Sequence, residues 1–221
     1  MQFRALISDL DGTLIDTLQD MANAVNTALC RLQLPPHEVS EYRYFVGDGR
    51  RTMALRALPY DQRDDCTLEQ LLAYIAEEYD GRWIDNSVPY PGIPEMLDEL
   101  TRQGIRLAVL SNKPQVYAGP MISTILSGWH FEHVLGESPD RPRKPAPAGA
   151  LQIIERMNVL PQECIYLGDS GVDMETARAA GMYGVGALWG FRDADELTRA
   201  GASLLAHHPA DVVTLVNHSL E

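Results

Sequence analysis

Two aspartates separated by one residue follow an apolar segment close to the N-terminus of the 221-residue chain. Residues 3–7 are apolar apart from Arg4, which predicts a short buried strand, and Asp9 and Asp11 come shortly after it. Alternate side chains of an extended segment project to the same side, so both carboxylates can point into one cavity. A divalent cation would remove the repulsion between them, since hard cations prefer carboxylate and carbonyl oxygens. The alternative is a strand that ends in a solvated Asp-Gly turn.

We predict later strands over 105–110, 131–135, 164–167 and 183–188, and further polar side chains follow the first three of them. Ligands of an open parallel α/β sheet bind at the carboxyl ends of its strands, so these side chains are candidates for the same site. In chain order they are Ser111, Asn112, Lys113, Arg141, Arg143, Lys144, Asp169, Ser170 and Asp173.

This set of side chains suits the transfer of a phosphoryl group. An aspartate can attack phosphorus and form an aspartyl-phosphate, which divides one difficult hydrolysis into two steps. The attack brings two anions together, so it needs a cation across them and donors around the phosphoryl oxygens. Asp9 and Asp169 can hold Mg²⁺, with the main-chain carbonyl of Asp11 as a further ligand. The Asp11 carboxyl group can protonate the leaving alkoxide and later take a proton from the attacking water.

The other candidates would surround this centre. Ser111 and the Asn112 amide can donate hydrogen bonds to phosphoryl oxygens, and Lys144 can neutralise their charge. Asp173 stands four residues beyond Asp169, about one helical turn, and is expected to orient the neighbouring groups rather than bind the metal itself.

Lysine usage is unusual in this chain, which has only Lys113 and Lys144 against sixteen arginines. Drift of the composition toward arginine is the simpler explanation of this ratio, and a need for a compact ammonium at both positions is the alternative. Lys113 is expected either to reach the active site or to face solvent.

Two hydrophobic patterns divide the chain. Residues 17–86 show helical spacing without a convincing strand, and the proline-rich segment 89–94 follows as a stiff connector. From there helices and apolar strands alternate, which predicts a Rossmann-like parallel sheet with helices on both faces. We therefore predict an α/β core domain of residues 1–16 and 87–221, with the helical segment 17–86 inserted after the first strand.

Composition restricts the class of protein. Hydrophobic and charged contents of 45% and 22% are ordinary for a globular chain. The formal charge of −13 argues against nucleic acid and anionic membranes as partners. No apolar run approaches the ~18 residues needed to span a bilayer, and the N-terminus lacks a secretory pattern. Three widely spaced cysteines are expected to be reduced, mostly buried thiols, as in a cytoplasmic protein. We expect the protein to be a monomer or a homodimer.

Four short motifs occur in order along the chain, at residues 9–13, 110–114, 143–145 and 168–173. They resemble the four motifs of the haloacid dehalogenase superfamily, and the resemblance covers the chain nearly end to end. It implies a helical cap domain at 17–86, Mg²⁺ as cofactor, and a small phosphorylated metabolite whose phosphoryl group is accepted by Asp9.

Within this superfamily the resemblance favours phosphatases. Asp11 argues against the dehalogenase branch, which lacks that second acid, and a cap without lysine excludes the phosphonoacetaldehyde hydrolases. The stretches 45–49, 89–92 and 189–191 are similar to phosphoglycolate phosphatases, which makes 2-phosphoglycolate the best substrate prediction. Pyrophosphatases, sugar or nucleotide phosphatases and β-phosphoglucomutases are alternatives, although the last usually lack a threonine at position 13.

Arg50 and Arg51 follow a Gly-x-Gly turn, where a closing lid could bring Arg50 onto a substrate carboxylate. The alternative is that both are solvated arginines on a helix.

A receiver-like signalling module with a long-lived phospho-aspartate is the non-enzymatic alternative to a phosphatase. Receivers lack both the helical insertion and an acid two residues beyond the acceptor.

Overall fold

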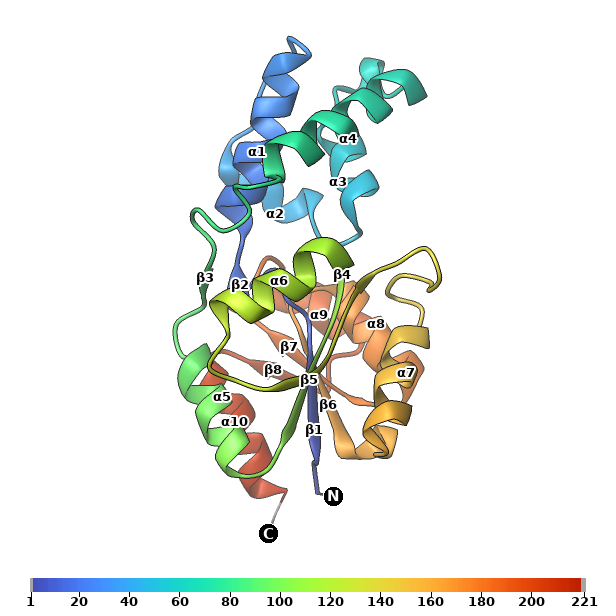
Figure 1. Ribbon diagram of the computed structural model, residues 1–221. Helices are drawn as coiled ribbons and strands as arrows, with labels where there is room; N and C mark the ends of the chain where they lie inside the picture. Colours follow the sequence, from blue (N-terminus) through green and yellow to red (C-terminus); the bar gives the residue numbers. More distant parts are fainter. Residues whose placement is uncertain (1, 220–221) are drawn as a thin grey trace. The chain divides into compact units, whose positions relative to one another are not determined.

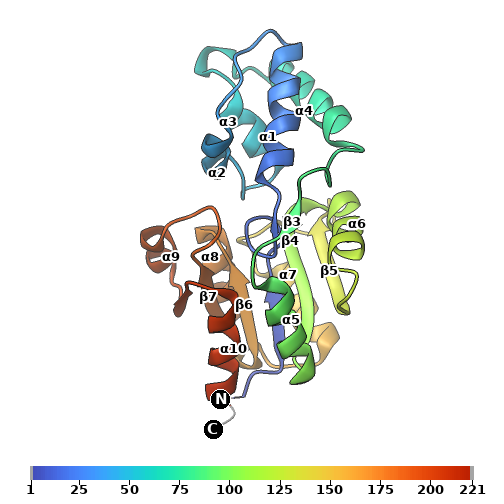
Figure 2. The ribbon, with the colours of Figure 1, turned by 90° about the vertical axis from the view of Figure 1, so that its left-hand side faces the viewer.

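The computed structural model describes residues 2–219, and the chain forms two compact units. One unit contains the chain up to Ile15 together with the chain from Pro89 onward, and the other contains Asp16–Val88. Figures 1 and 2 show the elements of both units. The outermost residues of the predicted core domain, 1 and 220–221, lie outside the described residues.

The first unit is built on a six-stranded sheet with the strand order β5-β4-β1-β6-β7-β8. Its strands are β1 (Ala5–Ser8), β4 (Arg106–Pro114), β5 (Phe131–Glu137), β6 (Cys164–Gly168), β7 (Tyr183–Ala187) and β8 (Leu204–Ala206). All neighbouring pairs in this order are parallel. The central strand β1 sets Ile7 opposite Ala108 of β4 and Tyr166 of β6. The predicted parallel α/β fold is thus confirmed.

Helices cover both faces of this sheet. They are α5 (Ile93–Arg102), α6 (Gln115–Ile125), α7 (Ala148–Met157), α8 (Gly171–Ala180), α9 (Ala194–Ala200) and α10 (Pro209–His218). Helices α5 and α10 lie side by side, and α7 and α8 pack against the opposite face (Figures 1 and 2). A buried apolar cluster joins β1, β4 and β6 to α7 and α8 through side chains such as Ile7, Leu110, Ile153 and Ala177. All four residues of β1 are buried, as expected for a strand covered on both faces.

The second unit is helical. It contains α1 (Leu18–Arg31), α2 (Tyr42–Phe45), α3 (Arg50–Ala57) and α4 (Asp65–Tyr79). The longest helices, α1 and α4, lie against each other (Figure 1) and bury apolar side chains that include Leu29 and Leu71. The two short strands β2 (Ile15–Asp16) and β3 (Val88–Pro89) pair where the chain enters and leaves this unit.

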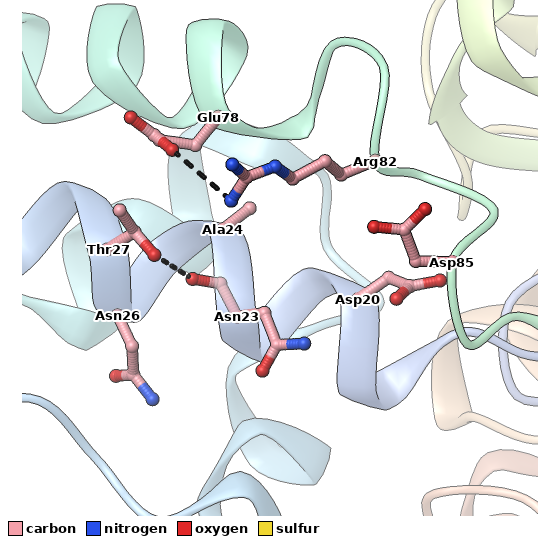
Figure 3. A pocket seen from close by; sticks show the side chains of 8 residues that line it. All are labelled: Asp20, Asn23, Ala24, Asn26, Thr27, Glu78, Arg82 and Asp85. Atoms are coloured by element: carbon pink, nitrogen blue, oxygen red, sulfur yellow. Dashed lines mark hydrogen bonds and ion pairs between the residues drawn. The ribbon is translucent and has the colours of Figure 1, made fainter.

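A polar cavity of about 350 Å³ lies between α1 and the segment that follows α4 (Figure 3). Several of the polar groups that line it are bonded within the unit. The buried Asp20 carboxylate accepts hydrogen bonds from the main chain and amide of Asn86 and from the Ser87 hydroxyl, at 2.6–3.0 Å. Glu78 and Arg82 lie 4.0 Å apart on another side. Asp20 therefore fastens the first turn of α1 to the segment that leads out of the helical unit.

Three details differ from the sequence predictions. Strand β4 extends to Pro114 rather than ending at Leu110, and the edge strand β8 has no counterpart among the predicted strands. The expectation of mostly buried thiols is wrong, because Cys30 and Cys66 are exposed and Cys164 alone is buried. Burial raises the pKa of the Cys164 thiol to about 12, so this group is an unreactive core residue. Among residues 2–219, no helix is long and apolar enough to cross a membrane.

Candidate active site

Asp9 and Asp11 lie at the carboxyl end of the central strand. The main chain continues the sheet by one residue, because Asp9 N–H donates to the Leu167 carbonyl at 2.9 Å. The chain then turns at Gly12, whose φ is +82°. A Cβ at this position would come within 2.5 Å of Asp169 Oδ2, so the turn needs glycine for both its conformation and its close contact.

Lys144 joins two of the predicted carboxylates. Its Nζ lies 3.0 Å from Asp9 Oδ1 and 2.7 Å from Asp173 Oδ1, and its side chain is only 2% exposed. Burial alone would lower the pKa of this ammonium, but Asp173 and Asp9 together raise it well above its ordinary value. Lys144 is therefore a charged group between two acids.

Asp169 is held by two segments that are distant in sequence. Thr13 Oγ1 donates to its Oδ1 at 2.9 Å, and the Phe191 main-chain N–H donates to its Oδ2 at 2.8 Å. Trp189 Nε1–H in turn donates to the Thr13 carbonyl at 2.9 Å. At Gly190, between the two aromatic residues, a Cβ would collide with the Asp169 side chain and the Gly12 carbonyl. The segment 189–191 thus fixes Asp169 against the first turn of the chain.

Asp173 is fixed at the start of α8. Its Oδ2 accepts hydrogen bonds from the main-chain N–H of Ser170 at 3.1 Å and from the Ser170 hydroxyl at 2.6 Å. Ser170 is also the N-cap of α8, in a reciprocal capping arrangement with Asp173. With its Oδ1 bonded to Lys144, the Asp173 carboxylate has partners on both oxygens.

The carboxylates of Asp9 and Asp169 fit a hard divalent cation, and Asp173, whose oxygens are bonded to Lys144 and Ser170, lies beside them. One carboxylate oxygen from each of Asp9, Asp169 and Asp173 lies within 4.8 Å of the others, and all three residues are buried. Burial and neighbouring carboxylates raise the pKa of Asp169 to about 8. Burial also raises the pKa of Asp9 to about 6, although Lys144 opposes the shift. Three buried acids around one ammonium carry excess negative charge, and a bound cation would compensate it.

The carboxyl end of β4 carries Ser111 and Asn112, which have different partners. The Ser111 hydroxyl oxygen accepts a hydrogen bond from the Lys113 N–H at 3.2 Å, which leaves its own O–H available as a donor. The Asn112 side chain bonds the main chain of Lys144, accepting from its N–H at 3.0 Å and donating to its carbonyl at 3.2 Å. Asn112 therefore holds Lys144 in place, and its predicted contact with a phosphoryl group stays a prediction.

Lys113 is buried and belongs to the same edge of the sheet. Its Nζ lies 2.9 Å from Asp11 Oδ1 and 3.2 Å from Asp11 Oδ2. The sequence left open whether Lys113 reaches the active site or faces solvent, and its burial excludes exposure to solvent.

The arginines near the predicted site have their own partners. Arg143 lies 3.5 Å from Glu137, and Arg141 contacts Gln152 and the Gly136 carbonyl. Arg50 is an exposed residue at the start of α3 in the helical unit, so its contact with a substrate stays a prediction. Arg51 forms ion pairs with acids of α4.

No role was predicted for the individual residues Trp189 and Phe191, although 189–191 is one of the stretches that resemble phosphoglycolate phosphatases, and the structure shows that both help to position Asp169. The signal was present, because both follow an apolar segment over 183–188 that reads as a strand. The other candidates were identified because they follow the carboxyl ends of predicted strands. Trp189 and Phe191 have the same position relative to the segment 183–188.

The site and the fold agree with a match to a known family. Residues 3–181 match the model of the haloacid dehalogenase-like hydrolases. The chain belongs to this family, as the four motifs indicated.

Curated relatives and solved structures extend the comparison. The chain is 34% identical over 206 residues to a phosphoglycolate phosphatase of Pseudomonas putida, an alignment that covers 91% of this chain and 75% of the relative. A solved structure from Lactobacillus delbrueckii subsp. bulgaricus superposes with a TM-score of 0.93 at 27% identity, covering 98% of this chain and 99% of the other. A predicted phosphoglycolate phosphatase from Haemophilus somnus superposes with a TM-score of 0.87 at 26% identity, covering 97% and 98% of the two chains.

Proposed function

We propose that this protein is a Mg²⁺-dependent phosphatase that hydrolyses a small phosphomonoester through an aspartyl-phosphate on Asp9. The observation that carries the proposal is the pairing of Asp9 with Lys144, 3.0 Å apart, beside the buried acids Asp169 and Asp173. An incoming phosphate dianion needs a nucleophile and a positive charge close together. An acid next to a fixed ammonium, at the end of a central parallel strand, provides both.

In the first step Asp9 attacks phosphorus and the leaving oxygen takes a proton from the Asp11 carboxyl group. Ser111 O–H donates to a phosphoryl oxygen, and Lys144 neutralises the charge that the two anions bring together. In the second step Asp11 takes a proton from water, which attacks the phosphorus and frees Asp9. Bound Mg²⁺, held by Asp9, Asp169 and the Asp11 carbonyl, would supply further charge neutralisation.

The substrate proposed is 2-phosphoglycolate. It rests on the names of relatives such as the Pseudomonas putida protein, and on the local stretches 45–49, 89–92 and 189–191.

We further propose that the helical unit Asp16–Val88 serves as the cap of the enzyme and that Arg50 binds the substrate carboxylate.

Phosphate release from a panel of 2-phosphoglycolate, pyrophosphate, hexose phosphates and p-nitrophenyl phosphate tests this function. We expect sustained turnover with MgCl₂, none with EDTA, and the highest kcat/KM for 2-phosphoglycolate. A higher kcat/KM for another member of the panel would correct the substrate while keeping the reaction. A single burst of product without turnover would instead support a receiver-like phosphoacceptor.

The Asp9→Asn variant tests the nucleophile in the same assay. Because an amide cannot accept the phosphoryl group in this way, we expect no turnover above background. The Asp140→Asn variant, which alters an exposed acid, is the matched control and should keep wild-type rates. Steady-state turnover by Asp9→Asn would overturn the assignment of the nucleophile.

A further inference from the structure

The only two lysines of the chain each pair with one member of the N-terminal acid pair. Lys144 contacts Asp9, and Lys113 contacts Asp11. All other basic side chains of the chain, apart from histidine, are arginines. Both positions therefore place a compact ammonium in a buried setting beside a carboxylate.

The contact between Lys113 and Asp11 is buried and close. Nζ lies within hydrogen-bond distance of both carboxylate oxygens, at 2.9 and 3.2 Å. The Lys113 side chain is 4% exposed and that of Asp11 is 17% exposed. The ammonium therefore lies inside, while the carboxylate that it holds retains access to the surface of the unit.

The main chain around Lys113 is also constrained. Its N–H donates to the Ser111 hydroxyl oxygen at 3.2 Å. Strand β5 runs so close that a Cβ at Gly136 would lie 2.6 Å from the Lys113 carbonyl. Neighbouring strands thus fix the point from which the lysine side chain extends, and the contacts with both Asp11 oxygens hold Nζ at its end.

We propose that Lys113 is a positioning residue that holds the Asp11 carboxyl group in the orientation needed for proton transfer. This inference rests on the proposed function. The Asp11 proton goes to the leaving oxygen as the oxygen–phosphorus bond breaks, and the attacking water replaces it when the phosphoryl group leaves Asp9. Lys113 itself neither gains nor loses a proton, and it acts on the reaction through Asp11.

Two aryl phosphates of similar shape separate this role from a direct contact with substrate. Phenyl phosphate releases a poorly stabilised anion that needs a proton, whereas p-nitrophenyl phosphate releases an anion that is stable without one. Since kcat/KM reports the steps up to the phosphoenzyme, we expect Lys113→Met to lower it about tenfold more for phenyl phosphate than for p-nitrophenyl phosphate. Asp11→Asn should show the same selectivity.

The matched control removes another ion-paired cation from the same strand. Arg106 pairs with Glu132 at the start of β4, so Arg106→Met should affect both substrates equally. Equal losses of kcat/KM for the two substrates in Lys113→Met would overturn the proposal, because a lysine that binds the phosphoryl group or only supports the fold makes no distinction between leaving groups.

A second measurement does not depend on catalysis. Protein labelled with ¹⁵N at lysine Nζ has only two side-chain ammonium positions, which Lys113→Met assigns by deletion. We expect Asp11→Asn to shift the Lys113 resonance and to leave that of Lys144 nearly unchanged. An unshifted Lys113 resonance would overturn the pairing. A shifted resonance in a protein that turns over no phosphate ester would instead reject the proposed function while the pairing stands.

Discussion

At the scale of single residues, the site consists of charges that are buried in pairs. Lys144 lies between Asp9 and Asp173, and Lys113 holds Asp11. Removing one partner of such a pair leaves an uncompensated charge in the interior, which is more costly than the loss of a surface ion pair. Each of these side chains therefore supports both the local structure and the proposed reaction.

The raised pKa values of Asp9 and Asp169 predict how pH and metal act together. Their values of about 6 and about 8 exceed the ordinary value of 3.8, so the metal-free folded protein retains protons that the unfolded chain releases. The stability of the metal-free protein should therefore fall as pH rises from about 4 to about 8. Mg²⁺ must displace these protons, so its binding becomes more favourable over the same range.

Thermal unfolding with EDTA and with MgCl₂, at about pH 5 and about pH 8.5, measures this coupling. We expect the increase in Tm caused by Mg²⁺ to be larger at the higher pH. In Asp169→Asn the increase should be small at both values, whereas Asp140→Asn should behave like the wild type. A Mg²⁺ effect that shrinks with rising pH would contradict the assigned ligands.

Gly190 predicts a second effect at this scale. A methyl group there would collide with the Asp169 side chain and the Gly12 carbonyl, so Gly190→Ala must displace Asp169. We expect the apparent affinity for Mg²⁺ to fall about tenfold or more, measured as the Mg²⁺ dependence of turnover or of Tm. Gly128→Ala is the control, since nothing lies within 4 Å of its Cβ. An unchanged Mg²⁺ dependence in Gly190→Ala would show that the segment 189–191 does not hold the metal site.

At the scale of elements, the position of each strand end decides which side chains meet. Strand β4 carries Ser111 and Lys113 beyond its apolar part, and its register beside β1 sets Val109 opposite Ser8. Sequence patterns gave the order and type of these elements, because buried parallel strands are continuous apolar runs. They placed the end of β4 too early, because the strand continues through polar residues whose partners lie elsewhere in the chain.

The site, too, could be predicted from the sequence only where residue type and local pattern were sufficient. Asp9, Lys144, Asp169 and Asp173 were found from residue type at strand ends, and they do come together. The pairing of Lys113 with Asp11 spans 102 positions and depends on the register of two strands, which no local pattern encodes. The short edge strand β8 escaped prediction because three residues are too few for a periodic signal.

Within the helical unit, Asp20 predicts the strength of one link between elements. Asp20→Ala would leave the donors of Asn86 and Ser87 without their acceptor in a buried setting. We expect the free energy of unfolding to fall by about 3 kcal/mol, measured by urea denaturation. Asn23→Ala, an exposed position on the same helix, should change it by less than about 0.5 kcal/mol. Equal effects of the two substitutions would show that the Asp20 bonds contribute little.

At the scale of the whole molecule, the chain combines a parallel α/β unit with a helical unit inserted after the first strand, within the haloacid dehalogenase-like hydrolases. Every site residue assigned to the chemistry itself, from Asp9 to Asp173, belongs to the α/β unit. We infer that the α/β unit carries the catalytic residues and that the helical unit determines which substrate is bound. Sequence and fold define the substrate less closely than they define the reaction.

Trapping of the covalent intermediate tests the central claim most directly. Wild-type protein and the Asp11→Asn variant would be mixed with MgCl₂ and p-nitrophenyl phosphate, whose leaving group needs no proton from Asp11, then quenched in acid, digested and analysed by peptide mass spectrometry. We predict one added phosphoryl group on Asp9, with a larger fraction trapped in Asp11→Asn because the attacking water loses its base. A phosphoryl group on another residue, or turnover without any phosphorylated peptide, would contradict Asp9 as the nucleophile.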